Sequence, residues 1–168
     1  MKVISTIAPL LVLSMSACSD VEKDGHGGHD HEHEVISTVE LTFTAEDDST
    51  QVIRWVDGEG QDEDIVLALD SVYNLGIRPL NELEQPIEDI TPEIIQEADE
   101  HQVFFTGSAI DNGLVVYTYN DSDDEGLPLG IDSDIDAVAA GSGDLTVTLR
   151  HLALQAVSYT HLTLPTTR

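Results

Sequence analysis

The sequence predicts a mainly β protein, an immunoglobulin-like antiparallel β-sandwich with one short inserted helix. Two observations lead to this fold class. Between residues 35 and 156, short stretches in which apolar and polar residues alternate are separated by clusters of Gly, Asp and Asn. Alternation with a period of two is the pattern of strands that bury one face. Only one segment carries helix signals, and a domain of about 120 residues suffices for one modest core.

The strand predictions follow this alternation along the chain. Val39, Leu41 and Phe43 alternate with polar residues, which places them on the buried face of the first strand. The acidic, Gly-containing segment Asp57–Asp62 is predicted to be a loop. Further strands are expected at Gln51–Val56, Ile65–Leu69, Val72–Arg78, Val103–Thr106, Leu114–Tyr119 and Leu145–Arg150.

One helix is predicted to begin at Thr91 and to end near His101. Thr91 is a favourable N-cap, Pro92 suits the first helical position, and Glu93 places an acid in the first turn. The ionisable residues of this segment suggest acid–base or metal chemistry, but we expect them on the exposed face of the helix: Glu97, Asp99, Glu100 and His101.

Residues 1–17 are typical of a secretory signal. Lys2 gives a basic start, Ile4–Leu13 is an apolar run, and small residues precede Cys18. The run is well short of the ~20 residues that a membrane-spanning helix needs. Cys18 is the one cysteine of the chain, so no internal disulfide can form and the fold depends on its core alone.

Ser16-Ala17-Cys18 resembles the bacterial lipobox. The resemblance implies cleavage before Cys18 and lipid on that cysteine, which would hold the mature chain to a membrane. Ser19 is similar to the residue that follows the cysteine in lipoproteins of the outer membrane, so the resemblance implies a cell-envelope location. The alternative is a buried N-terminal strand with an incidental cysteine, but residues 19–34 offer no apolar face beside which it could pack.

Residues 18–34 are predicted to be a disordered, acidic tether that is rich in histidine. The segment is polar and contains glycines without any periodicity. Imidazole nitrogens suit zinc and copper, and short His-rich tracts are typical of metal binding. The alternative is a solvated linker without a ligand. The candidate transition-metal ligands are His26, His29, His31 and His33.

A second candidate metal site is an acidic loop with the spacing of a calcium-binding loop. Oxygen ligands at positions 1, 3, 5 and 12, with Gly126 at position 6, match that spacing. Two acids differ from the usual types and Pro128 interrupts the loop, so the alternative is an acidic hairpin loop that faces solvent. The candidate calcium ligands are Asp121, Asp123, Glu125 and Asp132, and a similar loop with poorer spacing carries Asp57, Glu59, Asp62 and Asp64.

The charge of the chain excludes some partners. The formal net charge is -27, with 33 acidic and 6 basic residues. No basic stripe is present to neutralise phosphates, so nucleic acid is excluded as a partner. An enzyme is not expected either, because Cys18 is assigned to lipid and no serine lies in a recognised nucleophile motif.

The last segment, residues 157–168, resembles the translation of a sequencing-adaptor fragment. The resemblance implies a non-native tail, with the β-sandwich domain spanning residues 35–156 and its C-terminal strands missing. The alternative is a genuine strand over Val157–Leu164, which local propensity would allow. We therefore place no functional weight on His161 or Arg168.

Four segments between Val35 and His151 are distinctive when taken together: Val35–Phe43, Tyr73–Ile77, Glu97–Phe105 and Leu145–His151. They resemble a family of small bacterial envelope lipoproteins of unassigned function. Such proteins are often assigned to the type 1 periplasmic binding fold. That fold needs two α/β lobes with parallel sheets, whereas this chain is short and shows one helix, so we expect the β-sandwich.

The sequence thus predicts a lipid-anchored envelope protein with a binding role. In the concrete version, the His-rich tether captures zinc or copper beside an envelope transport protein, and calcium is a further candidate at the acidic loop. The alternative is a structural or adaptor lipoprotein whose β-sandwich binds another envelope protein and has no metal function.

Overall fold

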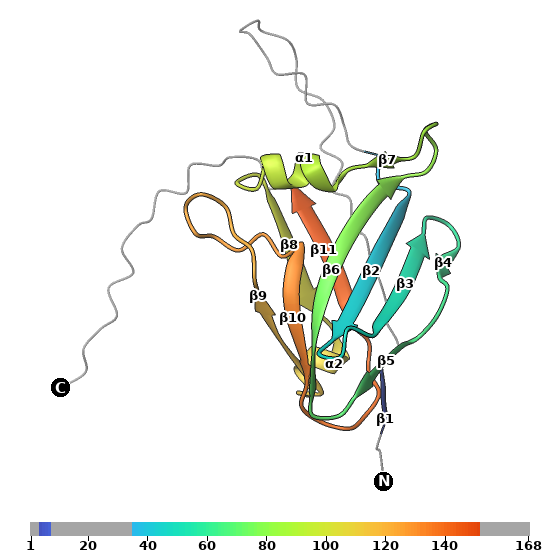
Figure 1. Ribbon diagram of the computed structural model, residues 1–168, viewed down its shortest axis with the longest axis vertical. Coiled ribbons are helices and arrows are strands. Elements are labelled where there is room, and N and C mark those ends of the chain that lie inside the picture. Colours follow the sequence, from blue (N-terminus) through green and yellow to red (C-terminus); the bar gives the residue numbers. More distant parts are fainter. Residues whose placement is uncertain (1–3, 8–34, 152–168) are drawn as a thin grey trace, which may run out of the picture.

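The computed structural model describes residues 4–7 and 35–151 of the chain (Figure 1). The candidate lipid-attachment residue Cys18, the tether histidines 26, 29, 31 and 33, and the tail 157–168 lie outside the described residues. Among the residues that are described, no helix has the length and apolar character needed to cross a membrane.

The main sheet has seven strands, and every neighbouring pair in it is antiparallel. Its order is β4-β3-β2-β6-β10-β9, with β7 paired to β6. The mainly β, antiparallel part of the fold prediction is therefore confirmed. The strands are β2 (Thr38–Ala45), β3 (Thr50–Val56), β4 (Gly60–Gln61), β6 (Ser71–Asn81), β7 (Glu88–Asp89), β9 (Val115–Tyr119) and β10 (Asp132–Ala137).

Two smaller sheets accompany the main sheet. The strands β8 (His101–Thr106) and β11 (Thr146–His151) pair with each other and lie behind the main sheet in Figure 1. The strand β1 (Ile4–Ile7) pairs with β5 (Ile65–Ala68). Because β1 belongs to the predicted signal segment, this pairing describes the uncleaved chain, and cleavage before Cys18 stays a prediction.

The core forms between these sheets because each strand alternates. Leu41 and Phe43 of β2 are buried, as the sequence predicts, and they share one core with Val103 and Phe105 of β8. Period-two alternation places every second side chain of a strand on the same face, so two facing strands can bury a continuous apolar layer. The small sheet is therefore held against the main sheet by packing.

The helix prediction was wrong in its extent. The helix α1 (Thr91–Gln96) has six residues, and Ile90, rather than Thr91, is its N-cap. The carboxylate of Asp89 accepts a hydrogen bond from the backbone N–H of Thr91 at 3.1 Å. A turn follows α1, and His101 opens strand β8 with only 4% of its surface exposed. Pairing between β8 and β11 thus prevailed over the weak helical propensity of this segment.

A second short helix, α2 (Ser108–Asp111), was not predicted, so the expectation of one helix was wrong as well. It follows β8 directly, and Gly107 makes the connection with φ of 109°. A Cβ atom at Gly107 would lie 2.4 Å from the carbonyl oxygen of Asp144. Glycine is therefore required by both the positive φ and the close approach of the backbone at Asp144.

The strands β4 and β10 were not predicted, and β4 lies within a segment that we predicted to be a loop. The short strand β4 pairs with β3, so Asp57–Asp62 forms a hairpin rather than an irregular loop. The strand β10 lies between β6 and β9 in the main sheet. Its buried residues Ser133 and Ile135 alternate with aspartates, and this high acidity obscured the period-two signal.

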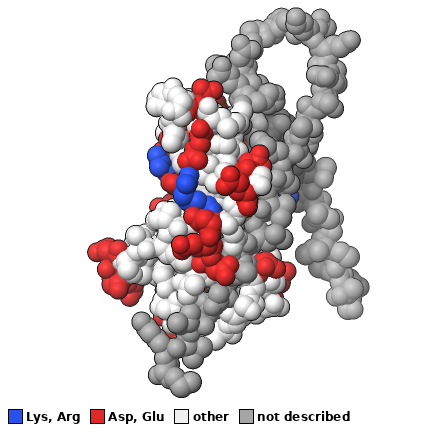
Figure 2. All heavy atoms as spheres, turned by 90° about the vertical axis from the view of Figure 1, so that its right-hand side faces the viewer, with Lys and Arg blue, Asp and Glu red and all other residues white. Residues whose placement is uncertain are grey.

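Ion pairs cross the outer face of the main sheet. Arg54 of β3 contacts Glu40 and Glu82, and Arg78 of β6 contacts Glu40 and Asp89. Figure 2 shows a few basic side chains among acidic ones on one face of the molecule. Each of these side chains is partly exposed, so each pair adds at most about 1 kcal/mol of stability.

Candidate metal centre

Two histidines are brought together by the register of the small sheet. In the β8–β11 pair, His101 lies directly opposite His151. The period of two places His101 on the same face as the buried Val103, and His151 on the same face as Leu149. The two rings are stacked, with centroids 4.8 Å apart and planes inclined by 21°. The strand pairing therefore fixes the backbone positions from which both imidazole side chains project.

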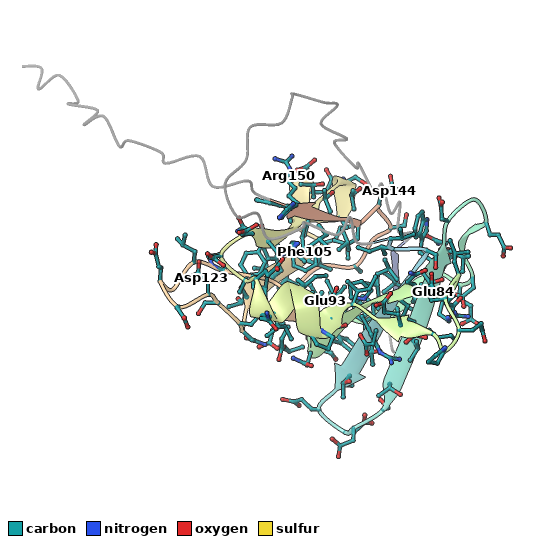
Figure 3. The ribbon with its side chains drawn as sticks, turned by 90° about the horizontal axis from the view of Figure 1, so that it is seen from above. Glu84, Glu93, Phe105, Asp123, Asp144 and Arg150 are labelled. Carbon is teal, nitrogen blue, oxygen red and sulfur yellow. The ribbon has the colours of Figure 1, made fainter. Side chains whose placement is uncertain are left out.

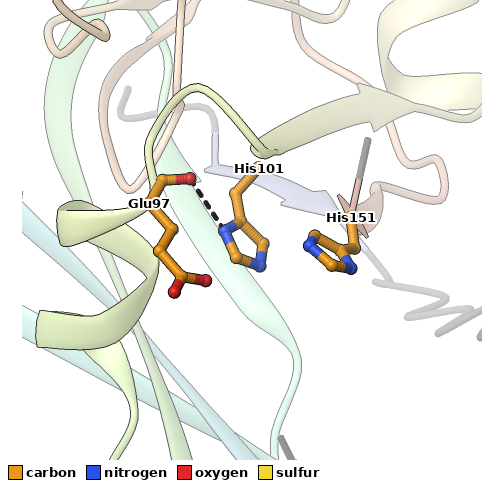
Figure 4. A group of neighbouring side chains, drawn as sticks. All are labelled: Glu97, His101 and His151. Carbon is orange, nitrogen blue, oxygen red and sulfur yellow. Dashed lines mark hydrogen bonds between the residues drawn. The ribbon is translucent and has the colours of Figure 1, made fainter. Parts of the chain in front are cut away.

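A carboxylate from the turn after α1 completes the group. Glu97 lies four residues before His101, and its backbone carbonyl accepts a hydrogen bond from Nδ1 of His101 at 3.0 Å (Figure 4). One ligand atom from each of Glu97, His101 and His151 lies within 4.8 Å of the other two. We call these three residues the His/Glu site.

The hydrogen bonds define the donor nitrogens of both rings. A carbonyl oxygen only accepts, so Nδ1 of His101 carries the hydrogen and, in the neutral ring, the lone pair is on Nε2. Nε2 of His151 donates to the carboxylate of Glu100 at 2.9 Å. With its Nδ1 held by the carbonyl oxygen of Glu97, His101 is oriented in the way that metal-ligating histidines are.

The His/Glu site suits a divalent transition-metal ion. Ligand atoms about 2.0–2.1 Å from a tetrahedral ion lie about 3.3 Å from one another, so the site must contract from its present spacing. His101 is buried and fixed, whereas Glu97 is exposed and His151 has half of its side-chain surface exposed. Rotation of the two exposed side chains can supply the contraction. Two imidazoles and a carboxylate fit zinc, copper or nickel.

The predicted calcium ligands have other partners. The carboxylate of Asp121 accepts the backbone N–H groups of Gly130 at 2.6 Å and Asp132 at 3.0 Å. Asp123 accepts those of Glu125 at 2.9 Å and Leu127 at 2.8 Å. These bonds close the loop between β9 and β10 on itself. Figure 3 shows Asp123 on this projecting loop, at the edge of the molecule.

Two of the remaining acidic candidates, Asp132 and Asp62, also accept hydrogen bonds. Asp132 accepts hydrogen bonds from the side-chain amides of Asn74 and Asn120, and Glu125 is exposed. In the second acidic loop, Asp62 accepts the backbone N–H of Arg54 at 2.9 Å. Within residues 4–7 and 35–151, the one group of three such ligands that converges is Glu97, His101 and His151. Calcium binding at the first loop stays a prediction.

A small apolar cavity lies near this end of the small sheet. Apolar side chains from both layers line it: Ile36, Val39, Ile77, Pro79, Val103, Ile131, Val147 and Leu149. Its interior has room for about one water molecule and offers no polar group to hold it. The cavity therefore adds no ligand site.

Glu97 and His101 were predicted on the exposed face of a helix, and His151 was not predicted to be a ligand. The available signal was the strand alternation. Extending the buried series of Val103 back to His101, and that of Leu149 on to His151, places both imidazoles on inward faces. No family model, curated protein or solved structure matches the chain.

Proposed function

We propose that this chain is a lipid-anchored protein of the cell envelope that binds a divalent transition-metal ion, zinc or copper, at the His/Glu site. The observation that carries the proposal is the convergence of Glu97, His101 and His151. Glu97 and His101 from one turn and His151 from the distant strand β11 meet at one corner of the fold, and a hydrogen bond on Nδ1 orients the ring of His101.

In this proposal the tether collects metal ions for the His/Glu site. Lipid on Cys18 would keep the chain at a membrane. The histidines of the tether would raise the local concentration of the ion, and an envelope transport protein would be the partner that supplies or accepts it. We also propose the immunoglobulin-like arrangement of the sheets and an outer-membrane location.

The test is isothermal titration of Zn²⁺ and Cu²⁺ into the full chain carrying Cys18→Ser, which prevents lipid attachment. A second protein, the tether variant, also has Asn in place of His26, His29, His31, His33 and His161. We expect it to keep one binding site with a stoichiometry of about one ion per chain, because the folded domain supplies three ligands.

Two substitutions, made separately in the tether variant, test whether the remaining ion binds at the His/Glu site. His151→Ala and Glu97→Gln change exposed side chains, so the fold should survive, and each should weaken binding at least about tenfold. Glu93→Gln, an exposed acid on α1, is the matched control. A tether variant that binds no ion would contradict the fixed site. Absence of binding by the full chain as well would favour the adaptor alternative.

A further inference from the structure

The structure assigns a fourth ligand to the proposed metal centre: we propose that Glu100 completes a closed set of two nitrogen and two oxygen ligands around the ion. The inference rests on the proposed function. Its starting observation is that Oε2 of Glu100 lies 2.9 Å from Nε2 of His151. Glu100 is not one of the three groups that already converge, so it must move when an ion binds.

The turn after α1 presents both carboxylates to the histidine pair. The backbone N–H of Glu100 donates to the carbonyl oxygen of Glu97 at 2.9 Å, which closes the turn between the two residues. Residue 101 follows immediately, so three of the four ligands come from one short segment. His151, at the end of β11, is the one ligand from a distant part of the sequence. The ion would thus join β11 to the α1–β8 turn.

The spacing between Glu100 and His151 is already close to that of two metal ligands. Their 2.9 Å separation needs to widen only to about 3.3 Å for both atoms to bind one tetrahedral ion. The ion takes the place of the shared hydrogen. In this step Nε2 of His151 and Oε2 of Glu100 each form a bond to the ion, and the ring proton is carried on Nδ1 instead.

Charge balance favours the second carboxylate. Neutral imidazoles carry no charge and each carboxylate carries one negative charge. A divalent cation therefore neutralises a set of two imidazoles and two carboxylates. Binding therefore removes a repulsion between neighbouring acids in a chain whose net charge is -27. Four protein ligands also leave no position open on a tetrahedral ion, which is typical of centres that hold a metal rather than use it in catalysis. The site would store or present the ion.

The test is a Co²⁺ titration of the tether variant, followed by visible absorption, because the bands of four-coordinate Co²⁺ are strong and those of six-coordinate Co²⁺ are weak. Glu100→Gln keeps the size of the side chain and removes its charge, and Glu93→Gln is the control. We expect Glu100→Gln to weaken Co²⁺ binding about 10- to 100-fold and to lower the visible bands. Glu93→Gln should change neither.

The outcomes separate this inference from the proposed function. If His151→Ala abolishes binding while Glu100→Gln leaves affinity or spectrum unchanged, the metal centre stands and the fourth ligand is wrong. If the tether variant gives no saturable Co²⁺ signal, both are wrong. A Glu100→His variant restores a donor atom at the same place, so recovery of four-coordinate bands in it would support a ligand role for this position.

Discussion

The His/Glu site and the loop between β9 and β10 are both rich in ionisable side chains, yet they differ in what those side chains contact. In the loop, Asp121 and Asp123 accept four backbone hydrogen bonds between them. At the His/Glu site, side chains from the α1–β8 turn and from β11 point toward one another. Carboxylates that already accept backbone N–H groups stabilise a loop without any ion.

Spacing in sequence is therefore a weak guide to a metal site. The loop has almost the spacing of a calcium-binding loop, but its acids are used to close the turn. The His/Glu site has no local spacing pattern that joins His151 to His101, because the β8–β11 register brings them together.

The largest effect is expected at His101. Replacing His101 with Ala removes a buried ligand, so we expect Zn²⁺ affinity of the tether variant to fall by about 100-fold or more. Loss of this buried ring also leaves a space in the fold, so thermal unfolding must be measured in parallel. His151→Ala supplies the matched variant at an exposed position. Retention of affinity in both would contradict the site.

The next effect is on stability, in the loop. Asp121→Ala leaves the backbone N–H groups of Gly130 and Asp132 without their acceptor, and we expect a loss of about 2 kcal/mol in the free energy of unfolding. Urea denaturation measures it. The loss should be the same with and without calcium if the acids only close the loop, whereas a calcium-dependent stabilisation that Asp121→Ala abolishes would support the calcium site.

A smaller, pH-dependent effect is expected at Tyr119, which connects the two regions. Its hydroxyl donates to the carbonyl oxygen of Val103 at 2.8 Å, and burial, with Tyr117 and Asp121 nearby, raises its pKa from 10 to about 12. A raised pKa of an acid favours its neutral form in the folded state. The contribution of Tyr119 is therefore full below pH 10 and is lost as the pH rises through about 12.

Tyr119→Phe removes this contribution and the hydrogen bond. We expect a loss of about 1 kcal/mol at neutral pH and a shallower decline of stability between pH 10 and about 12. Denaturant midpoints across that range measure both. An alkaline transition identical in wild type and variant would show that another group controls it.

The smallest effect is expected at Glu93. It lies on the exposed face of α1, one turn before Glu97, and its side chain belongs to neither region. Glu93→Gln should change metal affinity less than about twofold and stability by less than about 0.5 kcal/mol. A larger change in affinity would mean that general negative charge near α1, rather than the geometry of the His/Glu site, attracts the ion.

Most strands were predictable because alternation is a local property. The predicted first strand agrees closely with β2, and Val39, Leu41 and Phe43 are buried as expected. β10 shows the limit of this approach. Its outward aspartates make the segment look like a loop, although Ile131, Ser133, Ile135 and Ala137 form an unbroken buried series. A central strand can carry acids on its outer face because that face remains in water.

Residue types and their local period suffice to predict the β class, the buried faces of most strands and the acidity of the chain. Tertiary structure alone decided the length of α1, the strand position of His101 and its meeting with His151. The physical reason is that β pairing joins residues far apart in sequence, and its register is set by packing of whole sheets rather than by local propensity. The metal centre that we propose exists only through that register.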